Sequence, residues 1–157
     1  MRKIKWRTLI VSVLIPLIIG GFSALLTAEG MRDFDSFVKP PLSPPGWLFP
    51  VVWTSLYILM GVASYIVIES TASREEKERA LGVYLVQLVF NFLWSIIFFS
   101  LGLYYFAFIW LLALLVLIII SAWRFFKIDK TAGVLIIPYI IWVIFAGYLN
   151  LAIAYLN

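Results

Sequence analysis

The uncharged run ALGVYLVQLVFNFLWSIIFFSLGLYYFAFIWLLALLVLIIISAW, from Ala80 to Trp123, decides the fold. No Asp, Glu, Lys or Arg interrupts its 44 residues. A helix needs about 20 apolar residues to cross the hydrocarbon layer of a membrane, so the run is too long for one crossing and suits two. Gly102 stands where the two crossings would meet, and Tyr104 and Tyr105 after it are typical of an interfacial aromatic belt. The run therefore predicts two membrane helices joined by a short turn.

Three further apolar stretches of similar length complete the pattern. The five predicted spans are 8–28, 46–68, 80–101, 103–123 and 131–156. The sequence has none of the ten-residue segments of alternating polarity that the strands of a transmembrane barrel require. We therefore expect an all-α membrane protein in which residues 1–157 form one five-transmembrane-helix bundle.

Composition supports lipid as the solvent for most of the chain. Hydrophobic residues make up 64% of it and charged residues 13%, against about 45–50% and 25% in ordinary soluble proteins. A chain of 157 residues has too little interior to hide that much apolar surface from water. The composition excludes a water-soluble globule, a disordered chain and a nucleic-acid binder, so the expected partner is a lipid bilayer and not nucleic acid.

The chain contains neither Cys nor His. Thiolate nucleophiles and zinc–sulfur sites are thereby excluded, and the commonest general base and metal ligand is missing. We expect no metal site and no required cofactor. Seven Trp, eight Tyr and thirteen Phe remain, so any chemistry must use aromatic rings, amides and hydroxyls.

Basic residues predict the orientation, because cytoplasmic segments of membrane proteins are enriched in Lys and Arg. One side of the predicted bundle carries Arg2, Lys3, Lys5, Arg7, Arg74, Lys77, Arg79, Arg124, Lys127 and Lys130. The other side carries only Arg32 and Lys39. We expect a multi-pass protein of a bacterial plasma membrane, with the N-terminus in the cytoplasm and the C-terminus outside.

The first span permits an alternative, because its basic start and the sequence Leu26-Thr27-Ala28 resemble a cleavable secretory signal. Against that reading, the span carries a stripe of small or compact residues at every fourth position. The stripe consists of Ser12, Pro16, Gly20, Ala24 and Ala28. Such a stripe allows close approach of another helix, either within the bundle or across a dimer seam.

Charged residues are absent from the predicted apolar cores, whereas pumps and ion-coupled transporters usually need them there. A channel lined by charged rings is disfavoured for the same reason. Facilitated passage of an apolar molecule stays open.

Polar and aromatic side chains do recur inside the spans at helical spacing. The sets that share a face are Trp53 with Tyr57, Gln87 with Asn91 and Trp94, and Trp142 with Asn150. With a rise of about 1.5 Å per residue, the three tryptophans and Asn91 fall in the outer half of the membrane. Gln87 and Asn91 either hydrogen-bond between helices or face a ligand. The pattern predicts a binding site between three helices.

The long connection 29–45 belongs on the same side as that site. It contains Phe34 and Phe37 and ends Lys39-Pro40-Pro41-Leu42-Ser43-Pro44-Pro45, whose four prolines favour extended conformations. Long loops of this kind are often lids. We expect a lid that includes Phe34, Pro40, Pro44 and Pro45, or else a stiff connector.

Three ordered motifs carry a resemblance that covers nearly the whole chain. They are Lys39-Pro40-Pro41-Leu42-Ser43-Pro44-Pro45-Gly46-Trp47 continuing through Pro50, Trp53, Leu56 and Tyr57; Gln87-Leu88 with Asn91, Trp94 and Phe98-Phe99; and Pro138-Tyr139 with Trp142 and Leu149-Asn150. Together they resemble the TspO/MBR family of tryptophan-rich sensory proteins, which includes the mitochondrial translocator protein, or peripheral-type benzodiazepine receptor.

The resemblance implies a receptor or sensor, commonly a homodimer, that binds porphyrins such as protoporphyrin IX and haem, and other planar aromatic ligands, beneath the loop between spans one and two. The matching pocket positions are Trp53, Tyr57, Gln87, Asn91, Trp94, Trp142, Ala146 and Asn150. It also leaves two alternatives: light-dependent porphyrin degradation, with Trp53 and Trp142 as candidate catalytic residues, and transport of apolar small molecules.

The chain departs from the family pattern at the lid. Asp33-Phe34 stands where many members have Trp-Tyr, and Leu42 stands where many have Trp. Two indoles that photochemistry could use are therefore missing. No Lys or Arg follows Lys130, so the sterol motif proposed for the family is incomplete and we do not predict cholesterol binding.

Overall fold

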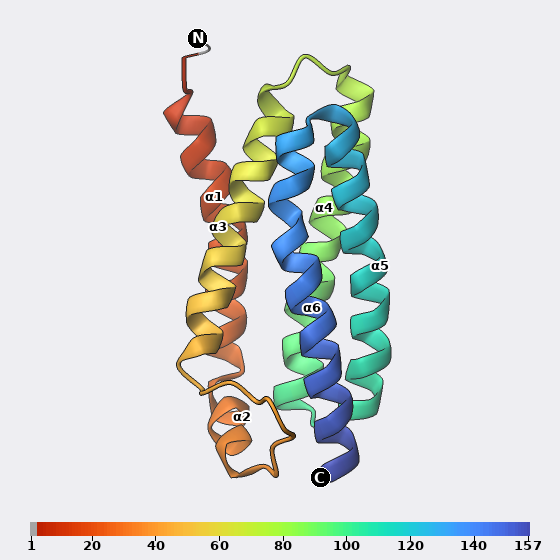
Figure 1. Cartoon of the computed structure of the whole chain (residues 1–157). Helices are drawn as coiled ribbons and strands as arrows, with labels where there is room; N and C mark the ends of the chain where they lie inside the picture. Colours follow the sequence, from red (N-terminus) through yellow and green to blue (C-terminus); the bar gives the residue numbers. More distant parts are fainter. Residues whose placement is uncertain (1–2) are drawn as a thin grey trace.

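A computed structural model describes residues 3–157. Its elements are α1 (Trp6–Leu26), α2 (Ala28–Asp33), the 3₁₀ turn η1 (Phe34–Ser36), α3 (Leu48–Glu69), α4 (Arg74–Ser95), the π-helical turn η2 (Ile96–Ser100), α5 (Tyr104–Ile128) and α6 (Lys130–Leu156). Five of these segments are long and apolar enough to cross a membrane, with η2 continuing α4. They lie side by side in one bundle, with short α2 at the end opposite the N-terminus (Figure 1). The expected all-α five-helix membrane fold is confirmed.

The helices extend beyond several of the predicted span boundaries. The third begins at Arg74 instead of residue 80, and the fourth ends at Ile128 instead of residue 123. The early start has a local cause: the Ser73 hydroxyl accepts from the Glu76 N–H, while the Glu76 carboxylate accepts from the Ser73 N–H at 2.9 Å. This capping box stabilises a polar first turn that a hydropathy boundary does not detect.

The turn between α4 and α5 confirms the break expected at Gly102. The chain leaves α4 through η2, in which the Leu101 N–H donates to the Ile96 carbonyl at 3.0 Å. Gly102 then adopts a φ of 64°, in the left-handed region that side chains disfavour. A π-turn followed by a left-handed glycine reverses the chain within a few residues.

The small residues of α1 pack inside the bundle against α3. Ser12 and Pro16 are buried. A Cβ on Gly61 of α3 would lie 2.4 Å from the Val13 Cα, and one on Gly20 of α1 would lie 2.1 Å from the Tyr57 ring. At Ser12 and Gly20 this face of α1 packs against α3, which is the first of the two uses that the stripe allows, whereas Ala24 is exposed.

The connection 29–45 is partly helical, which corrects the expectation of a loop throughout. Its first half forms α2 and η1, because 28–36 contains no proline and several good helix formers. The proline-rich half has no helix and turns at Pro41–Leu42, where Leu42 adopts a φ of 68° and the Ser43 N–H donates to the Pro40 carbonyl at 3.3 Å. Gly30 lets α2 approach η2 closely, since a Cβ there would lie 1.9 Å from the Phe99 carbonyl oxygen.

The topology gathers the basic segments at one end. The N-terminal end of the chain, the α3–α4 connection and the α5–α6 connection share one end of the bundle, and α2 and the α4–α5 turn share the other (Figure 1). At the basic end Lys5 pairs with Glu69 at 2.8 Å. Arg2 of the N-terminal basic cluster lies outside the described residues. The asymmetry that predicted the orientation is thus a property of two distinct ends.

Candidate functional site

A cavity of about 390 Å³ occupies the half of the bundle that carries α2. Its wall comes from α1 (Gly20, Ser23, Ala24), the α2–η1 segment (Met31, Phe34, Asp35), Gly46 before α3, α3 (Phe49, Pro50, Trp53, Tyr57), α4 and η2 (Trp94, Ser95, Phe98, Phe99) and α6 (Trp142, Ala146, Leu149, Asn150, Ile153). The volume falls within the range of about 300–1,000 Å³ that is usual for small-molecule sites. Four helices and the lid therefore enclose one ligand-sized space.

Six of the eight predicted pocket residues line this cavity. They are Trp53, Tyr57, Trp94, Trp142, Ala146 and Asn150. Of the predicted lid residues, Phe34 lines the cavity, whereas Pro40, Pro44 and Pro45 lie outside its wall. Pro40 is buried elsewhere and the other two shape the proline-rich half of the connection.

Aromatic rings form most of the cavity wall and hold one another in place. Trp53 stacks on Tyr57 with ring centroids 5.7 Å apart and an angle of 29° between planes. Phe49 of α3 packs edge to face on Trp142 of α6, with ring centroids 6.0 Å apart. Phe34 from the lid packs against Phe98, with ring centroids 6.3 Å apart. Offset and edge-to-face contacts at such distances are favourable, so the wall is stiff as well as apolar.

A buried chain of hydrogen bonds lies next to the cavity, on the side away from α2. The Tyr57 hydroxyl donates to Asn91 Oδ1 at 2.8 Å, and Asn91 Nδ2 donates to the Tyr139 hydroxyl at 2.8 Å. The Tyr139 hydroxyl donates in turn to Gln87 Oε1 at 2.9 Å, and Gln87 Nε2 lies 3.7 Å from Met60 Sδ. The chain connects α3, α4 and α6. The structure therefore places Gln87 and Asn91 in hydrogen bonds between helices and not on the cavity wall.

Asn150 lines the cavity, but its amide is already engaged. Its Oδ1 accepts from Trp94 Nε1 at 3.1 Å, and its Nδ2 donates to the Tyr104 carbonyl at 2.8 Å. Two other wall groups are buried without a partner: the indole N–H of Trp142 and the hydroxyl of Ser23. Nearly all buried polar groups in proteins are paired, so these two are exceptions that a bound molecule would satisfy once neighbouring side chains shift to expose them.

Charge is scarce around the cavity. Asp35 is the acidic residue of the wall, and its carboxylate pairs with Lys39 at 3.3 Å on the exposed side of the lid. Within residues 3–157 no three His, Cys, Asp or Glu side chains gather closely enough to hold a metal ion. The arrangement is suited to stacking and edge hydrogen bonding of an apolar, planar molecule.

A sequence model of the TspO/MBR family matches residues 12–156, which include the cavity-lining helices and the lid. The chain belongs to the TspO/MBR family. The resemblance carried by the three motifs is thereby confirmed, and so is a membrane protein of the kind named tryptophan-rich sensory protein or translocator protein.

Curated relatives of this TspO/MBR protein come from bacteria, archaea and animals. It is 39% identical to the tryptophan-rich sensory protein of Cereibacter sphaeroides over 124 residues, which cover 79% of this chain and 76% of the relative. It is 36% identical over 150 residues to the tryptophan-rich protein TspO of Archaeoglobus fulgidus, covering 95% and 96%. The translocator protein of Ovis aries is 34% identical over 136 residues, covering 83% and 79%.

Several wall residues of this TspO/MBR protein were not expected from its sequence. Ser23 looks like an ordinary small residue of a span, and Phe49 and Phe98 are two among thirteen phenylalanines. Tyr139 was quoted as part of a motif, but its place at the centre of the hydrogen-bond chain was not expected. Ser23 could have been identified from the helix face of α1 that carries Gly20, since residues three apart lie on the same face of a helix.

Proposed function

We propose that this TspO/MBR protein is a receptor or sensor that binds porphyrins and related planar aromatic ligands in the cavity beneath α2. One observation supports this most directly: the aromatic wall carries a buried indole N–H, that of Trp142, without a partner. A porphyrin is a flat, mostly apolar disc with polar edges, so it would stack on the rings and accept a hydrogen bond from this donor. The names of two relatives, tryptophan-rich sensory protein and translocator protein, are consistent with a ligand-binding role.

We further propose that the basic end of the bundle faces the cytoplasm of a plasma membrane. The three basic segments at that end support this orientation. The cavity and α2 would then lie on the extracytoplasmic side. A cysteine introduced at Ser73 and another at Leu42 would report it, since only Leu42→Cys should react with an impermeant maleimide added to intact cells.

Titration of the purified protein with protoporphyrin IX in detergent tests the binding proposal. Binding should shift the Soret band and quench tryptophan fluorescence. The double variant Trp53→Ala and Trp142→Ala should weaken affinity at least about 30-fold, because each indole contributes stacking and apolar contact of at least about 1 kcal/mol. Trp123→Ala is the matched control, since Trp123 is 54% exposed and is not among the residues that line this cavity. Equal affinity of the double variant and the control would refute the pocket assignment.

Light-dependent porphyrin degradation is a second candidate function, favoured by the presence of both Trp53 and Trp142 in the wall. These indoles would lie beside the bound macrocycle. Illumination of the complex should then consume porphyrin faster than the same light consumes free porphyrin in detergent, and should yield a defined product. Equal rates would leave the protein as a receptor without turnover.

A further inference from the structure

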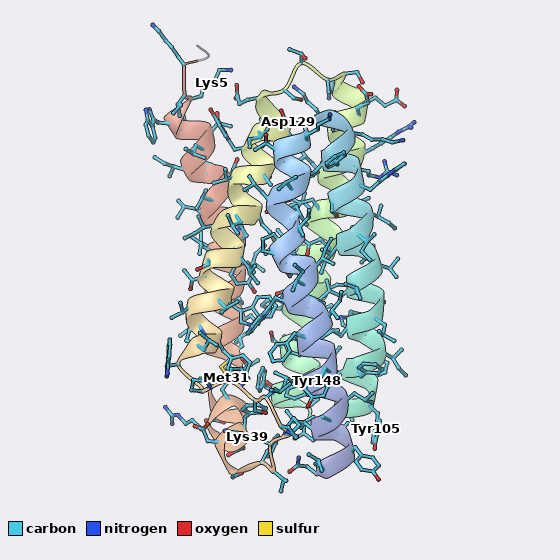
Figure 2. All side chains as sticks on the ribbon, in the orientation of Figure 1. Lys5, Met31, Lys39, Tyr105, Asp129 and Tyr148 are labelled. Carbon is cyan, nitrogen blue, oxygen red and sulfur yellow. The ribbon has the colours of Figure 1, made fainter. Side chains whose placement is uncertain are left out.

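The proline-rich half of the lid is tied to α6 and the residue after it by three hydrogen bonds. Asn157, directly after α6, pairs its amide with both backbone groups of Val38: the Val38 N–H donates to Oδ1 at 3.0 Å, and Nδ2 donates to the Val38 carbonyl at 3.1 Å. Nδ2 also donates to the Ile153 carbonyl at 3.1 Å, which fixes the amide on its own helix. The Tyr148 hydroxyl donates to the Pro41 carbonyl at 2.8 Å. Lys39 of the lid and Tyr148 lie at the same end of the bundle (Figure 2).

Apart from the buried Pro40, apolar packing contributes little to holding this part of the lid. Val38 and Leu42 are 59% and 82% exposed. The four prolines carry no N–H, so the segment has few backbone donors for other contacts. The bonds to α6 are exposed and therefore of modest strength, which allows them to break and reform.

The tied segment is continuous with residues that close the cavity. Phe37 precedes Val38 and packs on Tyr104 with ring centroids 5.6 Å apart. Phe34 and Asp35 lie a few residues before it and belong to the cavity wall. Gly46 belongs to the wall at the other end of the segment. Release of Val38 and Pro41 would therefore free both ends of the stretch that covers the cavity.

We propose that Asn157 and Tyr148 are positioning residues that latch the lid and thereby set the rate at which a ligand enters and leaves. The proposal rests on the proposed function for its ligand. Neither residue belongs to the cavity wall, so the latch acts alike on the empty and the occupied protein. Loss of the latch favours the open lid in both states. Entry and exit then accelerate together, while the equilibrium affinity stays the same.

The test uses three variants: Asn157→Ala, Tyr148→Phe and the double variant that carries both. The control is Tyr155→Phe, at the same end of α6. Tyr155 is 83% exposed, and this substitution removes a hydroxyl to which no hydrogen bond is assigned. Stopped-flow mixing with protoporphyrin IX gives both rate constants. Hydrogen exchange of the lid peptide that contains Val38 gives lid opening without any ligand.

The double variant should raise the association and dissociation rate constants about tenfold each and should keep Kd within about threefold, since three modest hydrogen bonds to the lid are lost. Exchange at the lid peptide should accelerate to a similar extent. Unchanged exchange and unchanged rates would overturn the latch. A higher Kd with an unchanged association rate would also overturn it, since Asn157 or Tyr148 would then act as a ligand contact. If no variant and not even the native protein bound porphyrin, the proposed function would fail, while hydrogen exchange would still decide whether the latch exists.

Discussion

The hydrogen-bond chain and the neighbouring cavity are made of the same kinds of residue and share α3, α4 and α6, although α1 and the lid also contribute to the cavity wall. In the chain, the polar atoms of Tyr57, Asn91, Tyr139 and Gln87 all find partners. In the cavity wall, the Trp142 N–H and the Ser23 hydroxyl find none. An unpaired buried polar group costs about 1–3 kcal/mol, which a bound molecule would offset at the cavity wall. Other buried groups without a partner lie outside the wall: Ser43 Oγ, Tyr84 Oη, Ser121 Oγ and Arg124 Nε. Between these two regions, polar side chains differ in their pairing more than in their type.

The largest expected effect on this comparison comes from breaking the chain with Asn91→Leu. The Tyr57 hydroxyl then loses its acceptor in a buried environment, and the bundle should lose about 2 kcal/mol of stability. Reversible unfolding in mixed micelles measures this loss, with the exposed Thr54→Val on α3 as control. The folded fraction should bind protoporphyrin IX with an affinity within about threefold of the native protein. Of the two side-chain hydrogen bonds that Asn91 makes among residues 3–157, one is to a wall residue, Tyr57. An intact stability with a much weaker affinity would instead make Asn91 a ligand contact.

A matched pair of tryptophan variants sharpens the comparison. Trp94→Phe removes an N–H that donates to Asn150, whereas Trp142→Phe removes one with no partner. Trp94→Phe should therefore destabilise the bundle by about 1 kcal/mol, and Trp142→Phe should leave its stability unchanged or slightly higher. Affinity for porphyrin should respond more strongly to Trp142→Phe, falling about tenfold with the loss of one buried hydrogen bond. Thermal melts and Soret titrations of both variants decide it. Equal losses of stability would mean that pairing does not distinguish the two regions.

The smallest expected effect concerns serine. Ser64 donates to the Gly61 carbonyl at 2.9 Å within α3, while Ser23 has no partner. Ser23→Ala should leave the melting temperature unchanged or raise it, and should weaken porphyrin affinity by about threefold at most. Ser64→Ala should lower the melting temperature slightly and leave affinity as it is. If Ser23→Ala alone were destabilising, its hydroxyl would have a partner in the folded protein.

Hydropathy was enough to place all five helices, because a span of about 20 apolar residues has no other stable environment. It missed the polar first turn of α4, which depends on the capping box at Ser73 and not on lipid. The helical half of the lid was missed for a related reason: four prolines dominate the composition of 29–45, although none lies before Pro40.

The site was predictable in outline, because spacing of four or eight residues puts Trp53 with Tyr57 and Trp142 with Asn150 on shared faces. Spacing cannot show how far each helix is rotated about its axis. That rotation turns Trp94 to the cavity and Asn91, three residues earlier, to Tyr139. Whether a polar atom is paired is likewise visible only once the helices are packed.

The most direct test of the central claim is an experimental structure of the protein with bound protoporphyrin IX. The macrocycle should lie beneath α2 between Trp53 and Trp142, with an edge atom within hydrogen-bond distance of Trp142 Nε1 and the Tyr57–Asn91–Tyr139–Gln87 chain intact. A macrocycle bound on the lipid-facing surface, or one that displaces Asn91 from its two tyrosines, would contradict the account.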